Sequence, residues 1–300
     1  SLLIELDTGR KLLKKNSVIV VDEAGMVGVK KLKKLLDHAK RTQSKLVLVG
    51  DHNQLSPIES GLAFSNLLKN QPAAYLQDIQ RQKATRDREN VQLIEQGKSV
   101  QVLNDLKARG LLHFDTDKIR CKFKLVDDWY KAASSNYREA LILASTRYDV
   151  ADLNLIARAK LADAGKLSPV SVQVVNHEET TIDLAEGERI MFRSNNRNLG
   201  VKNGSTGTIK QINQDRRSRK ITLSVTLDSG EEVQVNTSEY NAIEYGYAVS
   251  IHKSQGKTVD RSFVWLNEAF LNKELNYVQM SRSRFETQVY AGSSLQQELD

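Results

Sequence analysis

Two short apolar runs, each followed by acidic residues, constrain the fold of this chain more than any other feature of its sequence. The first run is Ser17–Val21, followed by Asp22 and Glu23, and the second is Lys45–Val49, with Asp51 two positions after it. Runs of this kind predict strands buried on both faces. Between them, apolar residues recur every three to four positions, which predicts an amphipathic helix. Strand, helix and strand predict a right-handed βαβ unit, whose carboxyl edge is where open α/β sheets bind their ligands.

The rest of the sequence continues the α/β pattern and is interrupted once. Helices are predicted at 88–110, 122–137, 147–164 and near 272–282, and strands at Ala140–Ala144, Ser262–Leu266 and near 287–291. After Pro169, short β-type stretches alternate with Gly and Asn turns, at 170–175, 180–184, 188–193, 205–213, 220–227 and 231–237. These stretches predict a small antiparallel β-barrel inserted in a second α/β unit. The expected division is 1–72 for a first lobe, 73–165 with 246–300 for a second lobe, and 166–245 for the barrel.

The composition excludes several classes of protein. A single cysteine cannot form an internal disulfide, and no Cys/His cluster has the spacing of a structural zinc site. The longest apolar runs are strand-sized, far short of the roughly 20 residues of a membrane span, and no signal-peptide pattern is present. With 40% hydrophobic and 27% charged residues, the composition is that of a globular chain. We therefore expect a cytoplasmic protein without membrane insertion.

The positive charge is concentrated in two stretches. The chain has 44 Lys and Arg against 37 Asp and Glu, a net charge of +7. Residues 193–220 hold eight basic residues and one acidic residue, which equals that excess, and residues 10–45 hold eleven basic and three acidic residues. Such stretches indicate a polyanionic partner, with nucleic acid the leading candidate. A solvated helix face explains the first stretch equally well, whereas the second favours binding through an exposed hairpin that carries Arg216, Arg217 and Arg219.

Asp22 and Glu23 after a hydrophobic strand form the pattern of a Walker B motif. In such a site the Asp binds Mg²⁺, directly or through water, and the Glu orients the attacking water. The polar loop after the second strand contains Gln54, whose amide can sense a γ-phosphate; the alternative is an ordinary turn that opens a helix. Neither motif is specific alone, because hydrophobic strands followed by two acids recur in unrelated proteins.

Five motifs taken together are specific. DEAG at 22–25, GDHNQLSPI at 50–58, IQRQ at 79–82, HKSQGKT at 252–258 and YVQMSRSR at 277–284 occur in the order and spacing of superfamily 1 helicases. They most resemble the RecD-like branch and the helicase part of conjugative relaxases of the TraA/TraI kind, and residues 187–209 resemble the inserted barrel of those proteins. The resemblance implies α/β architecture with two RecA-like parallel-sheet lobes and an inserted small antiparallel β-barrel. Residues 1–72 would be only the C-terminal part of the first lobe.

The resemblance also implies cofactors, ATP and Mg²⁺, and roles for single residues. Asp22 would bind the magnesium ion, Glu23 would activate water, and Gln54 would couple the γ-phosphate to the interface between the lobes. Arg81 and Arg282 would reach across that interface as arginine fingers, which stabilise the charge of the transition state. Arg284 would be either a third such cation or a structural residue. The HKSQG motif would contribute contacts to single-stranded DNA, from His252, Lys253, Ser254 and Gln255, and a glycine beside the nucleotide, Gly256.

The phosphate-binding loop of such a motor, G-x-x-x-x-G-K-[ST], is not found in the 300 residues. The tripeptide GKS at 97–99 has Gln92 where the first glycine belongs, and no strand precedes it. The tripeptide GKT at 256–258 has Ile251 in that place and belongs to the HKSQG motif. In the family the loop precedes the DEAG strand, and this chain begins 21 residues before Asp22. We therefore expect a fragment that begins downstream of the loop and is inactive as an ATPase by itself.

Three functions remain open at this point. The first is an ATP-dependent single-stranded-DNA translocase and helicase of a conjugative relaxase, with 5′-to-3′ movement by resemblance to the RecD-like branch. The second is a non-catalytic helicase-like module that binds single-stranded DNA or docks on a secretion channel, and the third is a RecD-like exonuclease V subunit. The intact motifs favour the motor, since a degenerate copy has no reason to keep them all. Its expected partners are single-stranded DNA and, in conjugation, type IV secretion or relaxosome proteins.

Overall fold

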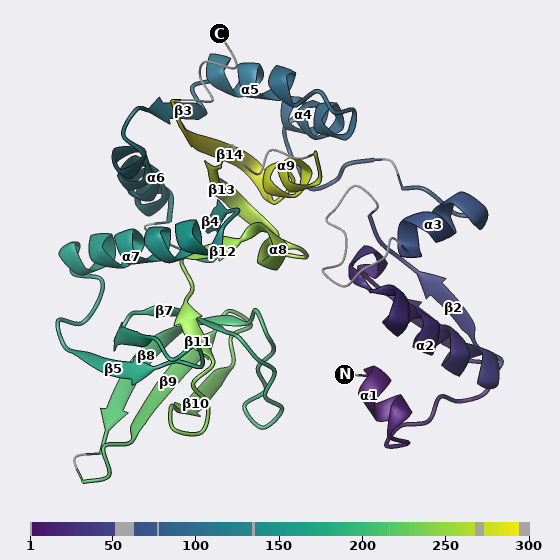
Figure 1. Cartoon of the computed structure of the whole chain (residues 1–300). Coiled ribbons are helices and arrows are strands. Elements are labelled where there is room, and N and C mark those ends of the chain that lie inside the picture. Colours follow the sequence, from purple (N-terminus) through teal and green to yellow (C-terminus); the bar gives the residue numbers. More distant parts are fainter. Residues whose placement is uncertain are drawn as a thin grey trace.

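The computed structural model describes residues 2–51, 63–76, 78–133, 136–215, 217–267 and 273–293. Figure 1 shows three groups of elements: a small α/β lobe at the N-terminal end, a larger α/β lobe built on one sheet, and an antiparallel barrel. Among the described residues, no helix has both the length and the apolar character that a membrane crossing requires. The limits of the three predicted domains stay a prediction.

The first lobe contains a short parallel sheet and its helices. Its elements are α1 (Leu2–Asp7), β1 (Val18–Val21), the 3₁₀-helix η1 (Ala24–Met26), α2 (Val29–Arg41), β2 (Lys45–Leu48) and α3 (Ala63–Asn70). β1 and β2 pair in parallel, with Ile19 opposite Leu46, so the predicted βαβ unit is confirmed. α2 buries Leu32, Leu35 and Ala39, which lie on one face at the predicted helical spacing.

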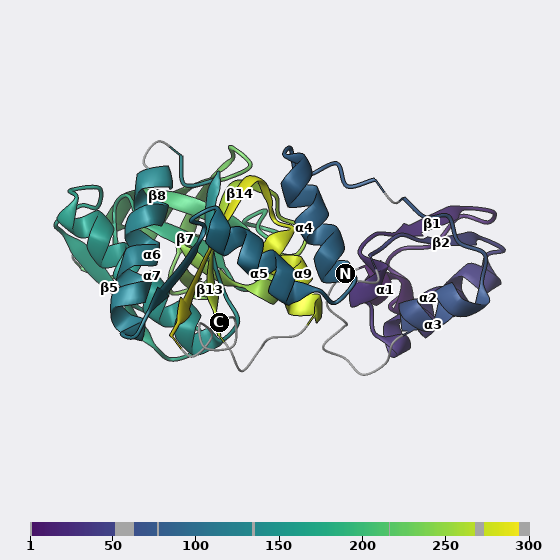
Figure 2. The same cartoon turned by 90° about the horizontal axis from the view of Figure 1, so that it is seen from above.

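The prediction that these two strands are buried on both faces is wrong for the described residues. Ile19 is 7% exposed, whereas Val18 and Val20 are 63% and 62% exposed. Successive side chains of a strand point to opposite faces, and the helices of this lobe lie on one side of the two strands (Figure 2). Among the described residues, helices therefore cover one face of the sheet and not the other.

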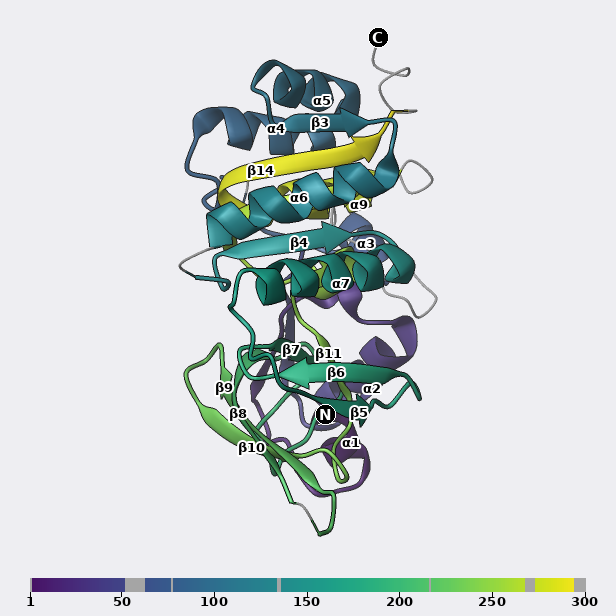
Figure 3. The same ribbon diagram turned by 90° about the vertical axis from the view of Figure 1, so that its left-hand side faces the viewer.

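The second lobe is built on a five-stranded parallel sheet in the order β12-β4-β13-β14-β3. Its strands are β3 (Leu112–Asp115), β4 (Ala140–Ala144), β12 (Ala248–Ser250), β13 (Val259–Leu266) and β14 (Ser283–Gly292). Helices α4 (Thr85–Glu95), α5 (Ser99–Ala108) and α9 (Lys273–Met280) pack on one face, and α6 (Lys118–Ala133) and α7 (Arg147–Asp163) on the other, as Figures 1 and 3 show. The short helix α8 (Ile251–Ser254) follows β12. β4 is buried on both faces as predicted, since Leu143 points into one core and Ile142 into the other.

The barrel consists of two antiparallel sheets around one core. Its strands are β5 (Ser171–Val175), β6 (Thr181–Ala185), β7 (Arg189–Phe192), β8 (Thr206–Gln214), β9 (Ile221–Leu227), β10 (Glu232–Asn236) and β11 (Ile243–Tyr245). β5 pairs with β6, and the other five form a sheet in the order β10-β9-β8-β7-β11. Side chains of both sheets meet in the core, among them Leu184 and Leu223. The chain enters from α7 and leaves into β12, so the predicted insertion in the second lobe is confirmed.

Two helix predictions are wrong in their limits. The segment 88–110 forms two helices, α4 and α5, because Gly97 between them has a φ of +76°, outside the helical region. The helix predicted at 122–137 begins at Lys118 and ends at Ala133. Its start is set by Asp117, whose Oδ1 accepts hydrogen bonds from the backbone N–H groups of the second and third residues after it.

Candidate functional site

The acidic residues that follow β1 lie at the carboxyl edge of the first sheet. Glu23 has a left-handed backbone, with φ 50° and ψ 41°, a conformation that costs a non-glycine residue about 1–3 kcal/mol and clusters at functional sites. Its backbone N–H donates to Asp22 Oδ1 at 2.9 Å. The Asp22 side chain is exposed and offers the hard oxygen ligands that Mg²⁺ prefers.

Gly50 lets the ends of β1 and β2 approach each other. A Cβ at this position would lie 3.1 Å from the backbone nitrogens of Ala24 and Gly25, which is too close for an ordinary contact. The Ala24 N–H donates to Val49 O at 2.8 Å and ties the acidic turn to β2. A side chain at this position would therefore need the acidic turn to shift by a few tenths of an ångström.

Arg282, directly before β14, is 1% exposed. Its Nε donates to Val278 O at 3.0 Å, its Nη2 to Ser281 Oγ at 2.7 Å and its Nη1 to Ser254 O at 3.5 Å. All three acceptors are neutral oxygen atoms. These hydrogen bonds hold the guanidinium in place without neutralising its charge.

The charges around Arg282 come from both lobes. Burial and the neighbouring Arg81 lower the pKa of Arg282 to about 10, while Tyr277, Glu23 and Asp51 act in the opposite direction. At neutral pH the guanidinium is therefore still protonated. A buried cation near two acids of the other lobe is the electrostatic arrangement of an anion or metal–anion site.

Arg81 contacts the residue that precedes Arg282 in the chain. Its Nη1 donates to Ser281 O at 2.7 Å. Gln82 Nε2 donates to the same oxygen at 3.2 Å and to Ser283 O at 2.9 Å. Two guanidinium groups held on one short segment repel each other unless an anion lies nearby, and phosphate is the anion that such groups bind well.

The two lobes meet at these motifs. Burial and the charge of Asp51, which follows β2, raise the pKa of Tyr277 in α9. On the same interface, a Cβ on Gly256 would lie 4.0 Å from Glu23 Oε1. The structure thus brings Glu23, Gly256 and Arg282 together, although they are far apart in the sequence.

The HKSQG motif divides into exposed and buried side chains. His252 is exposed and Lys253 is half-buried. Ser254 is fully buried, and its Oγ donates to Ile251 O at 2.7 Å, so its role as a DNA contact stays a prediction that this geometry does not favour. The amide nitrogen and oxygen of Gln255 are buried and have no hydrogen-bond partner within the described residues. Such atoms cost about 1–3 kcal/mol when unpaired, so the Gln255 amide is available to a hydrogen-bond partner from outside the described residues.

Lys253 lies close to an acid that sequence reasoning missed. Glu244 of β11 has one carboxylate oxygen 3.8 Å from Lys253 Nζ and the other 3.2 Å from Arg193 Nε. Burial raises the pKa of Glu244, against the effect of Arg193. His177 and Glu178 place ligand atoms within 4.8 Å of one another and of Glu244, a geometry compatible with a metal ion, but the two carboxylates already face basic side chains. No motif in the sequence signals this cluster, because its members come from separate turns and strands.

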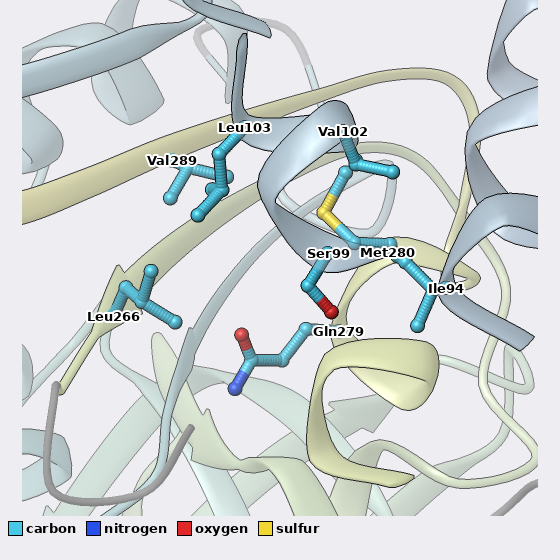
Figure 4. Close-up of a pocket in the computed structure, with 8 residues that line it drawn as sticks. All are labelled: Ile94, Ser99, Val102, Leu103, Leu266, Gln279, Met280 and Val289. Carbon is cyan, nitrogen blue, oxygen red and sulfur yellow. The ribbon is translucent and has the colours of Figure 1, made fainter. Parts of the chain in front are cut away.

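A small apolar pocket lies behind α9 in the second lobe (Figure 4). Its lining residues are Ile94, Ser99, Val102, Leu103, Leu266, Gln279, Met280 and Val289. Within the described chain, Gln279 Nε2 has no hydrogen-bond partner. The cavity volume of about 20 Å³ is enough for one water molecule. It is too small for a nucleotide, so the interface between the lobes remains the candidate site.

The remaining predicted residues are either outside the described residues or away from this interface. Gln54 and Arg216 lie outside the described residues. Arg217 and Arg219 are exposed in the turn between β8 and β9, where the Arg217 N–H donates to Asp215 Oδ1 at 2.8 Å. That hairpin points away from α8 (Figure 1), so any DNA contact it makes would be separate from the HKSQG motif, and its role stays a prediction.

The contacts of Arg284 favour the structural one of its two predicted roles, which stays a prediction. Its Nη1 donates to Asp260 Oδ1 at 2.8 Å and to Glu139 Oε2 at 3.2 Å. A guanidinium that is paired with two carboxylates has its charge neutralised within the second lobe.

Comparison with known proteins yields relatives over nearly the whole chain. A family model described as an AAA domain matches residues 1–117. The probable conjugal transfer protein TraA of Sinorhizobium fredii is 35% identical over 95% of this chain and 25% of that protein, and TraA of Agrobacterium fabrum is 34% identical over the same shares. The RecBCD enzyme subunit RecD of Mycolicibacterium smegmatis is 27% identical over 91% of this chain and 50% of that protein. The chain spans about a quarter of the length of the TraA proteins it matches.

Solved structures of Pif1 helicases share the fold. The crystal structure of Bacteroides Pif1 bound to ssDNA has a TM-score of 0.59 at 17% identity and covers 90% of this chain and 70% of that one. Pif1 from Candida albicans has a TM-score of 0.55 at 18% identity, over 90% of this chain and 71% of that one. At such low identity the likeness concerns the fold alone, and it confirms the predicted class of RecA-like lobes with an antiparallel insertion.

Proposed function

We propose that this chain belongs to the RecD-like branch of the superfamily 1 helicases, on the strength of its similarity to TraA and RecD proteins, and that it forms most of the motor of an ATP-dependent single-stranded-DNA translocase. The observation that carries this proposal is the convergence of Glu23, Arg81 and Arg282 on one interface between two lobes. A non-catalytic module would have no use for a buried, unneutralised arginine that faces acids of the other lobe.

The residues at the interface fit ATP and Mg²⁺. Asp22 offers an exposed carboxylate for the metal ion, and Arg81 and Arg282 offer two cations for the phosphates. The buried amide of Gln255 has no hydrogen-bond partner within the described residues, and a nucleotide would supply one. Bound ATP with its magnesium ion would supply the phosphoryl group whose hydrolysis drives movement.

Each residue then has one task in hydrolysis. Glu23 orients the attacking water with its carboxylate, which its left-handed backbone presents toward the second lobe. Arg81 and Arg282 stabilise the negative charge that develops on the transferred group, an effect worth about 10³–10⁵ in rate where arginine fingers have been measured. Gln54 couples the γ-phosphate to the closure of the lobes.

Single-stranded DNA would run across both lobes. His252, Lys253 and Gln255 would contact the strand or relay its presence to the nucleotide, and the β8–β9 hairpin with Arg216, Arg217 and Arg219 would add phosphate contacts. Phosphate contacts of this kind are independent of sequence and weaken with salt. Movement from 5′ to 3′ is carried over from the RecD-like branch.

Conjugative DNA transfer is the context that the relatives favour. Identity is 35% to a TraA protein and 27% to a RecD subunit, at similar coverage of this chain. We therefore assign the protein to a conjugative relaxase with relaxosome or type IV secretion partners, ahead of an exonuclease V subunit. Since the phosphate-binding loop is not among the 300 residues, the chain as given would not hydrolyse ATP at a meaningful rate.

The test is Glu23→Gln in a longer chain that carries the phosphate-binding loop. Turnover of ATP stimulated by single-stranded DNA should be lost while ATP binding is kept, because the amide no longer activates water but leaves the metal ligand in place. Glu179→Gln is the matched control, since Glu179 also has a positive φ, of 60°, but lies in the barrel. Unchanged hydrolysis in the Glu23 variant would refute the assignment.

A further inference from the structure

Tyr247 lies where the chain passes from the barrel back into the second lobe, between β11 and β12 (Figure 1). The residue is 2% exposed. Its ring packs in the core that α6 and α7 form with the second sheet, edge to face with Trp129 at 5.8 Å between the ring centroids. Its hydroxyl lies against the barrel, where it donates to Glu188 Oε1 at 2.6 Å and accepts from the Arg189 N–H at 3.2 Å. One side chain is thus shared between the lobe and the barrel.

Glu188, directly before β7 of the barrel, is fully buried. Its Oε1 accepts from the Tyr247 hydroxyl, and its Oε2 accepts from Arg158 Nε of α7 at 3.0 Å. Burial and the neighbouring Glu188 raise the pKa of Tyr247, so the hydroxyl keeps its proton and donates. A buried carboxylate is tolerated only where donors satisfy it. Both of these donors come from outside the barrel strands, so a barrel that turned away from the second lobe would leave Glu188 without them.

The backbone of Tyr247 is fixed on the side that leads to the HKSQG motif. Asn154 Oδ1 of α7 accepts from the N–H groups of Tyr247 at 3.0 Å and Ala248 at 2.8 Å. Asn154 Nδ2 donates back to Ala248 O at 3.1 Å. Ala248 is the first residue of β12, and α8 follows this strand directly. A displacement of the barrel at Glu188 would therefore reach α8 through Tyr247 and one short strand.

We propose that these hydrogen bonds form a barrel joint, which fixes the barrel to the HKSQG segment so that both move as one body with the second lobe. The joint consists of Asn154, Arg158, Glu188 and Tyr247. Without it, two chain crossings would let the barrel turn on the lobe, as units within one chain do by default. In the proposed function, on which this part rests, the four are positioning residues that hold the β8–β9 hairpin and α8 at a fixed spacing along single-stranded DNA. The existence of the joint does not depend on DNA and is tested separately.

The first experiment measures hydrogen exchange of backbone amides in the 300-residue chain by NMR. The amides of Tyr247 and Ala248, both bonded to Asn154, report on the joint. The amide of Thr237 reports on the barrel and that of Val289 on the second lobe, since each is hydrogen-bonded within its own unit. Tyr247→Phe removes only the hydroxyl. It should speed exchange at the joint by about tenfold and leave the two reference amides within about twofold, because a buried carboxylate loses a donor and the opening is local.

The control for this experiment is Tyr245→Phe. The Tyr245 hydroxyl of β11 also donates to a buried partner, Asp183 O at 2.7 Å, but that oxygen belongs to β6 of the same barrel. All four amides should therefore keep their wild-type exchange rates within about twofold. Joint amides of Tyr247→Phe that exchange no faster than those of Tyr245→Phe would overturn the joint. A uniform rise at all four amides would also overturn it, since the hydroxyl would then stabilise the whole chain and not the contact with the barrel.

The second experiment measures the affinity for two dT oligonucleotides by fluorescence anisotropy. The shorter one fills a single site, and the longer one reaches both α8 and the β8–β9 hairpin. A fixed spacing between two sites raises the gain in affinity from the added length. Tyr247→Phe should therefore reduce this gain by about fivefold and leave the affinity for the shorter oligonucleotide within about twofold. Arg217→Gln combined with Arg219→Gln removes the hairpin site and gives the gain that length alone confers.

An unchanged gain in Tyr247→Phe would overturn the positioning role. If the wild-type chain gains no more from length than the hairpin variant, the proposed DNA contacts of the hairpin fail. Hydrogen exchange still decides in that case whether the joint exists.

Discussion

Arg282 and Arg284 lie two positions apart in one motif and differ in what surrounds them. Arg282 is fully buried, donates to neutral oxygens within the described part of the chain and faces the first lobe. Arg284 is 39% exposed in its side chain and is paired with Asp260 and Glu139. The motif alone does not tell them apart, because the acids that neutralise Arg284 come from distant segments. Arg282, which has no such carboxylate pair among the described residues, is therefore the arginine that is available to bind a phosphate.

Glu244 offers a residue-scale prediction on DNA binding. In Glu244→Gln, Lys253 and Arg193 lose the carboxylate that faces them, so the affinity for single-stranded DNA should rise by about two- to fivefold at neutral pH, as ion pairs near the surface contribute up to about 1 kcal/mol. Burial raises the pKa of Glu244, so the wild-type carboxylate takes up its proton as the pH falls through a value above the usual 4.5. Wild-type affinity should therefore approach that of the variant on acidification. Fluorescence anisotropy with a short oligonucleotide measures both profiles.

The control for Glu244→Gln is Glu232→Gln, which removes the same charge from an exposed position of β10. The histidines of the region are present in all variants and cancel in the comparison. Parallel pH profiles for wild type and Glu244→Gln would show that the carboxylate does not restrain Lys253.

Among the elements, the break between α4 and α5 depends on one residue. Gly97 has a φ of +76°, and a Cβ there would meet nothing within 4 Å. Gly97→Ala should therefore cost only the backbone strain, about 1 kcal/mol in the free energy of unfolding, measured by urea denaturation. Gly97→Asn is the matched control and should cost less, since Asn tolerates the left-handed region better. An alanine variant as stable as the wild type would mean that the two helices can join.

The sequence predicts strands better than it predicts helix limits. The barrel strands agree with their predicted ranges within one or two residues, because apolar alternation and Gly turns are local signals. Ala140–Ala144 is a fully buried strand as predicted. The start of α6 depends on a single capping aspartate. The burial of β1 depends on which other segments cover the sheet, and the sequence of residues 17–21 holds no information on that.

At the scale of the whole molecule, the order of the motifs predicts a site between two lobes. The contacts between the lobes then show which residues lie close together there. Where the structure describes the motifs, it brings residues of four of them together, namely Glu23, Arg81, Gly256 and Arg282, whereas residues 52–58 of the remaining motif lie outside the described residues. The effect of Asp51 on the pKa of Tyr277 and the approach of Gly256 to Glu23 had no sequence signal, since they depend on how two lobes meet. The charge pattern predicts basic surfaces but not their positions, and the β8–β9 hairpin lies away from α8 (Figure 1).

The measurement that tests the central claim most directly is DNA-stimulated ATP hydrolysis in a longer chain with the phosphate-binding loop, compared between Arg282→Gln and Arg284→Gln. If both lobes build one nucleotide site, Arg282→Gln should lower kcat by about 10³-fold or more, whereas Arg284→Gln should stay within about twofold of the wild type. Thermal unfolding of both variants confirms that each is folded. A folded Arg282→Gln variant that hydrolyses ATP as fast as the wild type would contradict the claim.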